Sequence, residues 1–98
     1  MKLADYIKDT ITILYISNNT CSVCGVVEPK IEQFLEEHYP KLKLTVVKID
    51  ENPELKGELM IFTAPAVLIY FEGKEVFRKA GYVSPADLDD ILDKIYNL

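Results

Sequence analysis

Two periods of apolar residues alternate along the chain and divide it into expected strands and helices. Residues 11–17 (ITILYIS) are β-branched and almost continuously apolar, as in a strand that is buried on both faces. Residues 42–50 (LKLTVVKID) and 66–71 (AVLIYF) indicate two further strands. The tight turn Glu72–Lys74 then predicts that residues 75–80 return as an antiparallel fourth strand.

Between the first two strands the apolar residues recur at helical spacing. The pattern from Cys24 to Leu35 predicts a long helix that runs from Cys21 to about Tyr39, because Pro40 would stop it there. The turn-forming residues 18–20 (NNT) separate this helix from the strand before it.

Three further segments are expected to be helical. Residues 3–7 indicate a short opening helix, and residues 51–60 a short helix or turn. The closing helix has the signature of a well-defined start, with Ser84 as the N-cap, Pro85 at the first helical position and Asp87 completing a capping pair.

The expected order of elements is α-β-α-β-α-β-β-α. Strand–helix–strand units favour parallel pairing, while the final hairpin adds an antiparallel edge. The sequence therefore predicts an α/β protein, a single domain over residues 1–98, with a central mixed β-sheet of about four strands and helices on both faces.

The charge balance narrows the classes of partner. A net charge of −5 argues against nonspecific nucleic-acid binding and against docking to anionic membranes. No apolar run approaches the length of a membrane span, and residues 1–10 do not resemble a signal peptide. We therefore expect a cytoplasmic protein that binds neither nucleic acid nor membrane.

The two cysteines of the chain, Cys21 and Cys24, stand at the expected junction between strand and helix. The start of a helix presents unpaired backbone N–H groups and a positive dipole end, which favour a thiolate over a thiol. Cys21 is therefore predicted to be the nucleophile in disulfide exchange. Cys24, about one helical turn later, would then attack the mixed disulfide and release the product.

Two other interpretations of the pair stay open. The cysteines could be buried structural residues, as free cysteines often are. A metal site would need about four ligands, and the only histidine, His38, lies about four helical turns from Cys21. A zinc or iron–sulfur site shared across a dimer is the remaining metal alternative. We expect a monomer with no metal and no bound cofactor.

Five further features of the sequence fit one family. Pro29 lies five residues after Cys24, and residues 50–53 (DENP) follow the expected central strand. Pro65 comes twelve residues after Pro53, and the glycines 73 and 81 fall in register after it. With these residues, nearly the whole chain resembles the thioredoxin family. The resemblance implies a thioredoxin-like fold, with Pro65 as a cis-proline that faces the cysteines. It also implies reduction of protein disulfides, with electrons from a partner reductase or a low-molecular-weight thiol.

Four positions depart from the thioredoxin pattern. Thr20 replaces the tryptophan before the first cysteine, residues 22–23 (SV) replace Gly-Pro, and Tyr15 stands where thioredoxin buries an aspartate. The usual leading β-strand of the family is also expected to have no counterpart before residue 11. A tyrosine is a poor base at neutral pH. Glu28, on the same helical face as Cys24, is therefore a candidate proton acceptor, although it could equally be a solvated helix carboxylate.

The resemblance also assigns residues that bind substrate. The carbonyl and N–H of Ala64, in the segment 63–66 (TAPA), would pair with an extended substrate strand. Gly81 would allow the substrate backbone to approach closely, and Tyr82 would supply an aromatic contact. Phe62 would add to an apolar docking rim.

Two rival functions follow from the departures. An adaptor module would keep the fold with weak redox activity, and the rim of Phe62 and Tyr82 would suit it. A glutathione-type thiol exchanger would need a charged pocket near Thr63 and Tyr82, where the sequence places no cluster of cations.

Overall fold

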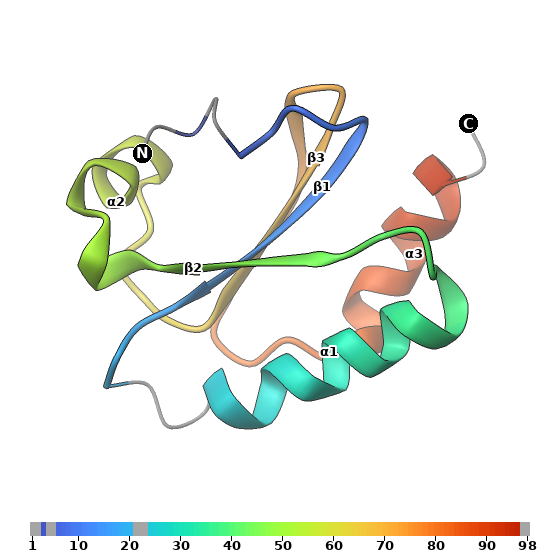
Figure 1. Cartoon of the computed structure of the whole chain (residues 1–98), viewed down its shortest axis with the longest axis horizontal. Helices are drawn as coiled ribbons and strands as arrows, with labels where there is room; N and C mark the ends of the chain where they lie inside the picture. Colours follow the sequence, from blue (N-terminus) through green and yellow to red (C-terminus); the bar gives the residue numbers. More distant parts are fainter. Residues whose placement is uncertain (1–2, 4–5, 21–23, 97–98) are drawn as a thin grey trace.

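A computed structural model of the chain describes residues 3, 6–20 and 24–96. The elements in order are β1 (Ile11–Ser17), α1 (Cys24–His38), β2 (Leu44–Lys48), the 3₁₀ turn η2 (Ile49–Glu51), α2 (Pro53–Leu59), β3 (Ala66–Phe71), β4 (Lys74–Ala80) and α3 (Pro85–Tyr96). This arrangement confirms the expected α/β fold (Figure 1).

The four described strands form one mixed sheet in the order β2-β1-β3-β4. β1 runs parallel to β2, with Ile13 opposite Leu44, and antiparallel to β3, with Ile13 opposite Ile69. The crossover through α1 explains the parallel pair, and the β3–β4 hairpin explains the antiparallel edge. The predicted sheet is therefore confirmed.

Alternate residues of β1 supply the two apolar cores on either side of the sheet. Ile13 and Tyr15 belong to a cluster with residues of α1 and α3, whereas Leu14 and Ile16 belong to a cluster with residues of α2. Helices thus cover both faces of the sheet, and β1 is buried on both sides, as its continuous apolar run predicts.

β2 is shorter than the nine residues expected. Its pairing with β1 starts at Leu44 and stops at Lys48, where β1 itself ends at Ser17. The next residues, Ile49–Glu51, turn into η2 because no strand partner is left for them. The offset also leaves Ile11, at the start of β1, without a partner on β2.

The two predicted turn signals act as expected. Glu72 and Gly73 both have positive φ, 50° and 83°, as in a two-residue hairpin turn that suits the twist of the strands. Before α3, the N–H of Ser84 donates to Asp87 Oδ2 at 2.8 Å, and the N–H of Asp87 donates to the carbonyl of Ser84 at 3.0 Å. Lys79 Nζ also contacts Asp87 Oδ2, at 2.9 Å.

The expected opening helix is described only in part. The N–H of Tyr6 donates to the carbonyl of Leu3 at 2.9 Å, which makes a single turn. Leu3, Tyr6 and Ile7 pack against the core cluster on the α2 side of the sheet. The apolar side chains of this segment therefore pack against the core, as predicted. Residues 1–2 and 4–5 lie outside the described residues.

Arg78 connects the edge strand β4 to the end of α2. Its Nε and Nη2 form a two-point contact with the Glu75 carboxylate, at 3.1 and 2.8 Å. Its Nη1 donates to the carbonyl of Leu59 at 2.8 Å, which satisfies one of the unpaired carbonyls at the helix end. Met60 follows in the left-handed conformation, with φ of 55°.

Candidate active site

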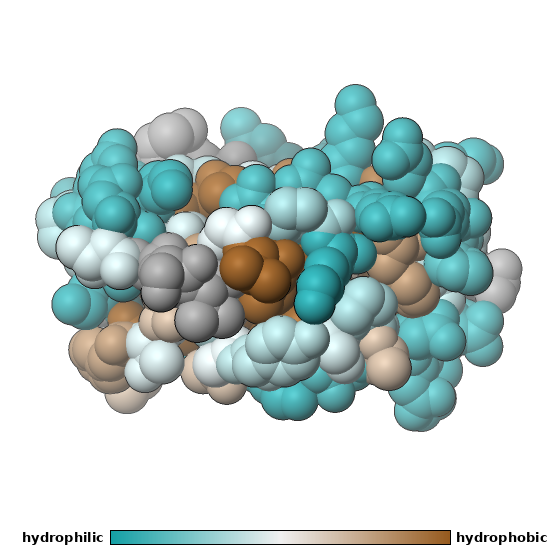
Figure 2. Space-filling view, turned by 90° about the horizontal axis from the view of Figure 1, so that it is seen from below, coloured by the Kyte–Doolittle hydropathy of each residue, from teal (hydrophilic) through white to brown (hydrophobic). Residues whose placement is uncertain are grey.

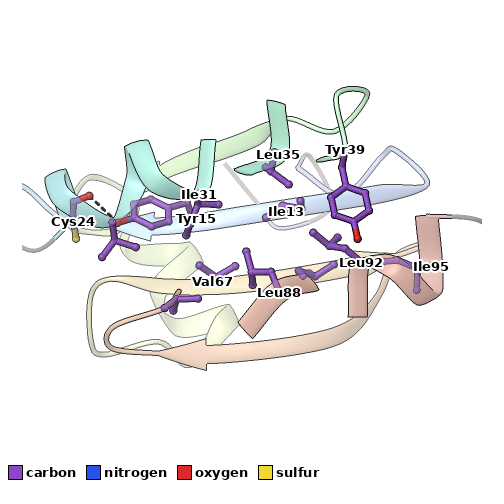
Figure 3. Close-up of a cluster of buried hydrophobic side chains, with 13 residues drawn as sticks. Ile13, Tyr15, Cys24, Ile31, Leu35, Tyr39, Val67, Leu88, Leu92 and Ile95 are labelled. Atoms are coloured by element: carbon purple, nitrogen blue, oxygen red, sulfur yellow. Dashed lines mark hydrogen bonds between the residues drawn. The ribbon is translucent and has the colours of Figure 1, made fainter. Parts of the chain in front are cut away.

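Cys24 begins α1 as the structure describes it, and its side chain is 3% exposed. It is disulfide-bonded and packs in the core cluster between α1 and the sheet, as Figure 3 shows. The predicted nucleophile Cys21 lies outside the described residues. The burial of Cys24 suits a resolving thiol that meets only a disulfide formed next to it.

Tyr15 anchors the first turn of α1 from beneath. Its side chain is 0% exposed, and its hydroxyl donates to the carbonyl of Cys24 at 2.8 Å (Figure 3). Burial, followed by the negative charge of Glu28, raises the pKa of Tyr15 to about 12, while a hydrogen bond from the Glu28 backbone acts the other way. Tyr15 is therefore neutral at physiological pH and does not accept a proton from a thiol.

The sequence identified Tyr15 as the residue that replaces the family's buried aspartate and as a poor base, but its hydrogen bond to Cys24 was missed. The signal available was its position six residues before Cys21, where the family places a functional side chain. This hydrogen bond joins the sheet to the helix, and neither the apolar period nor the spacing of residues along the chain predicts such a contact.

Glu28 lies half-buried on α1, one turn after Cys24. Its pKa is raised, first by burial and then by a hydrogen bond and like charge from Glu32, while Lys48 opposes the shift. A raised pKa makes a carboxylate a better proton acceptor near neutral pH. The electrostatics therefore suit the role expected for Glu28.

The Ala64–Pro65 peptide bond is cis, as predicted. Ala64 packs against the core cluster that contains Cys24, and the carbonyl of Pro65 accepts a hydrogen bond from the N–H of Gly81 at 2.7 Å. Gly81 has φ of 90°, a conformation that side chains disfavour. The cis-proline segment, the Gly81 segment and the start of α1 are therefore brought together.

The surface around these segments carries exposed apolar side chains. Phe62 is 75% exposed and Tyr82 55%, and Val26 is exposed in the first turn of α1. Thr63, beside Phe62, is also exposed. Figure 2 shows a patch of apolar surface on the face formed by α1. Phe62 and Tyr82 are thus both exposed, and their role in substrate docking stays a prediction.

A hollow of about 320 Å³ separates the segment before Cys21 from the segment before Pro65. One wall is fixed by Asn19, whose N–H donates to Asp50 Oδ2 at 3.0 Å and whose Nδ2 donates to Glu51 Oε2 at 3.1 Å. The lining residues are Asn18, Thr20, Ile49, Asp50, Lys56, Ile61, Phe62, Thr63 and Ala64. Among the described residues that line the hollow, Lys56 is the one cation, whereas a small-thiol exchanger would need a cluster of cations.

Metal ligands do not gather near this site. Among residues 3, 6–20 and 24–96, no group of three or more His, Cys, Asp or Glu side chains is placed to hold a metal ion. His38 ends α1 and stacks against Phe34, with ring centroids 5.0 Å apart. In the same described part of the chain, no helix is long and apolar enough to cross a membrane.

Comparison with known proteins gives a consistent family. Residues 2–94 match the Thioredoxin family. A thioredoxin-like protein, YdfQ, of Bacillus subtilis is 32% identical over 87 residues, which cover 89% of this chain and 77% of that protein. A thioredoxin of Listeria monocytogenes is 34% identical over 74 residues, which cover 76% of this chain and 72% of the other.

Solved structures agree with the sequence relatives. Thioredoxin 1 from Thermosipho africanus superposes with a TM-score of 0.74 at 26% identity, covering 99% of this chain and 96% of that one. Chloroplastic thioredoxin z superposes with a TM-score of 0.76 at 28% identity, covering 93% and 82%. On its fold, its cis-proline segment and these relatives, the chain belongs to the thioredoxin family and is a thioredoxin-type redox protein.

Proposed function

We propose that the protein is a thiol–disulfide oxidoreductase that reduces protein disulfides through the dithiol of Cys21 and Cys24. The observation that carries the proposal is the placement of Cys24: buried, disulfide-bonded, and packed at the start of α1 beside the cis-proline segment. A disulfide at the start of a helix is where thiolate chemistry is favoured.

The reaction balances within the dithiol. The Cys21 thiolate attacks one sulfur of the substrate disulfide, which forms a mixed disulfide and releases the other sulfur as a thiolate. Cys24 then loses its proton and attacks Cys21 Sγ, which releases the second substrate thiolate. The substrate gains two electrons and the protein ends as a disulfide. A partner reductase or a low-molecular-weight thiol returns two electrons to it.

Substrate binding is assigned to the rim around the cysteines. Ala64 lies in neither a helix nor a strand, and its backbone forms no hydrogen bond to another backbone group among the described residues. Its N–H and carbonyl are therefore available to an extended substrate segment. Phe62 and Tyr82 would contact apolar side chains of the substrate, while Thr63 and Gly81 would shape the groove. Because Phe62 is 75% exposed, an adaptor that binds through this rim with little redox activity is the second candidate.

Glu28 is proposed to accept the proton of Cys24, directly or through water. Glu28→Gln should slow resolution of the mixed disulfide about 10-fold or more at neutral pH. The difference in this rate between Glu28→Gln and wild type should become smaller above the ordinary thiol pKa of about 8.5, where the thiol ionises without a base. Glu36→Gln, a change at an exposed position of the same helix, is the matched control. Equal rates and pH profiles for the two variants would remove Glu28 from the mechanism.

Reduction of insulin by dithiothreitol distinguishes the oxidoreductase from the adaptor. The wild-type chain should accelerate it, Cys21→Ser should not, and Cys24→Ser should accumulate mixed disulfides with its substrate. Ser22→Ala, inside the same motif, should keep the activity. If the wild-type chain and Cys21→Ser both leave the rate of insulin reduction at that of dithiothreitol alone, while both still bind partners, the adaptor is the correct function.

A further inference from the structure

The hollow of about 320 Å³ borders both parts of the proposed redox site. Thr20, one of its lining residues, directly precedes Cys21 in the sequence. Ala64, another lining residue, precedes the cis bond to Pro65, and its backbone is free of hydrogen bonds to other backbone groups among the described residues. A substrate that is held at Cys21 and along Ala64 therefore passes the edge of this hollow.

Apolar side chains line the inner and the outer part of the hollow. Ile49 is 6% exposed and Ile61 3%, and both belong to the core cluster on the α2 side of the sheet. Phe62, which also lines the hollow, is 75% exposed. An apolar group that enters would therefore contact both the core and the exposed ring, and its transfer out of water is favourable.

Hydrogen bonds hold the walls of the hollow in place. On one side, the N–H of Asn19 donates to Asp50 Oδ2 at 3.0 Å. On the other side, the N–H of Ile61 donates to the carbonyl of Lys56 at 3.3 Å. The hollow is therefore formed before any substrate arrives, as binding pockets usually are.

The charges of the lining favour an uncharged occupant. Lys56 is the one cation and Asp50 the one carboxylate among the described residues that line the hollow, so these two charges balance. One oxygen of Asp50 already accepts the hydrogen bond from Asn19. A charged side chain would lose its water here without meeting an excess of opposite charge, which is unfavourable.

The volume of the hollow suits a single side chain. Pockets for small molecules range from about 300 to 1,000 Å³, and this hollow lies at the lower end of that range. Among uncharged side chains, the aromatic ones bury the most surface and pack favourably against a second ring. Phe62 supplies that second ring.

We propose that this hollow is a subsite for an uncharged aromatic side chain of the substrate, within two residues of the cysteine that Cys21 attacks. An extended chain advances about 3.3 Å per residue, so only side chains close to that cysteine reach the hollow. The inference rests on the proposed oxidoreductase function and names the substrates that it favours. The aromatic ring would lie against Phe62 and Ile61 while the substrate backbone pairs with Ala64.

Symmetric disulfides of short peptides are the probes. The parent peptide is acetylated Ala-Ala-Cys-Ala-Ala amide, and four others carry one Phe in place of each alanine in turn. Full-length protein is reduced with dithiothreitol, freed from it and mixed with each peptide. In this single turnover the protein dithiol becomes a disulfide and the peptide disulfide becomes two thiols, which chromatography measures.

The expected result is a preference for Phe at one or more of the four positions. The best Phe peptide should react about 10-fold faster than the parent, because burial of the ring is available only to it. Glu or Lys at the same position should change the rate less than about 3-fold, because the two charges of the lining balance.

Thr20→Trp tests the hollow itself. A large side chain at this edge should fill the hollow, so the ratio of the Phe-peptide rate to the parent rate should fall to about 3 or less. Thr20→Ser is the matched control and should keep the wild-type ratio. Because each ratio is measured within one variant, any change in the reactivity of Cys21 cancels.

A pair of exposed aromatic residues separates the hollow from the rest of the rim. Phe62→Ala should lower the ratio about 3-fold, because one aromatic wall of the hollow is lost. Tyr82→Ala removes an exposed ring that does not line the hollow and should keep the wild-type ratio. An equal loss in these two variants would place the substrate ring on the rim and overturn the subsite.

The outcomes distinguish this inference from the function on which it rests. If the Phe peptides and the parent react equally, if the Glu or Lys peptide reacts fastest, or if Thr20→Trp keeps the wild-type ratio, the subsite is wrong while the oxidoreductase function stands. If no peptide reacts faster with the wild-type chain than with Cys21→Ser, the oxidoreductase function is wrong and the subsite fails with it.

Discussion

Tyr15 and Thr12 lie three residues apart on β1 and point to opposite faces of the sheet. Both side chains are buried, but the Tyr15 hydroxyl donates to Cys24 while Thr12 Oγ1 has no partner among the described residues. The hydroxyl groups at the two ends of β1 therefore differ in their hydrogen bonding. At the redox end the Tyr15 hydroxyl holds α1 in place, and at the other end the Thr12 hydroxyl is buried without a partner among the described residues.

The largest effect on stability is expected at Tyr15. Tyr15→Phe should lower the free energy of unfolding by about 1–3 kcal/mol, because the buried hydrogen bond from the Tyr15 hydroxyl to the carbonyl of Cys24 is lost. Urea denaturation measures this, and Tyr82→Phe, at an exposed position, should stay within about 0.5 kcal/mol of wild type. A Tyr15→Phe protein as stable as wild type would mean that the hydroxyl does not hold the helix.

The raised pKa of Tyr15 adds a pH dependence. A tyrosine that ionises at about 12 in the folded chain and about 10 unfolded stabilises the fold below pH 10 and loses that contribution as pH rises towards 12. The wild-type chain should therefore lose stability above pH 10 more steeply than Tyr15→Phe. Parallel curves for the two proteins would contradict this.

Thr12→Val is expected to act in the opposite direction. It should raise the free energy of unfolding by about 1 kcal/mol, because a buried hydroxyl without a partner is replaced by a methyl group of similar shape. Urea denaturation again measures the change. A loss of stability would show that Oγ1 has a hydrogen bond, and the contrast with Tyr15 would disappear.

Asp87 tests a partly exposed polar group that has several partners. Asp87→Asn should cost about 0.5–1 kcal/mol at neutral pH, because the capping contact to Ser84 and the ion pair with Lys79 weaken. Lys79, followed by Ser84, lowers the pKa of Asp87, so its contribution is present above pH 4 and is lost as pH falls through the lowered value. Asp90→Asn, a change at an exposed position of the same helix, is the matched control at neutral pH.

The smallest effect is expected at Tyr39, whose hydroxyl donates to Asp89 Oδ1 at 2.9 Å. Tyr39→Phe should cost about 0.5 kcal/mol, because Asp89 is exposed and water replaces the lost donor. Thermal unfolding at neutral pH measures it. A cost equal to that of Tyr15→Phe would show that burial of the acceptor does not set the difference between them.

The sequence predicted those features that depend on neighbours along the chain. The apolar period located β1 and β3 to the residue. The capping pair at Ser84 followed from local chemistry. Each of these can be read from one segment, because its cause lies within that segment.

The features that were missed depend on how segments meet. The shortening of β2 follows from the end of β1, which no property of residues 42–50 reveals. The bond from Tyr15 to Cys24 joins a strand to a helix, and the hollow beside Ala64 arises where three separate segments meet. Such features need the tertiary arrangement, because neither partner alone indicates the contact.

Arg78 has a consequence for recognition. By holding the end of α2 through Leu59, it sets the direction in which the chain leaves that helix, through Met60 and towards the exposed ring of Phe62. The Arg78 guanidinium on the edge strand β4 thereby helps to position the exposed ring of Phe62, which is proposed to contact the substrate. A substitution of Arg78 on β4 would then change how Phe62 is presented, through the backbone at Leu59.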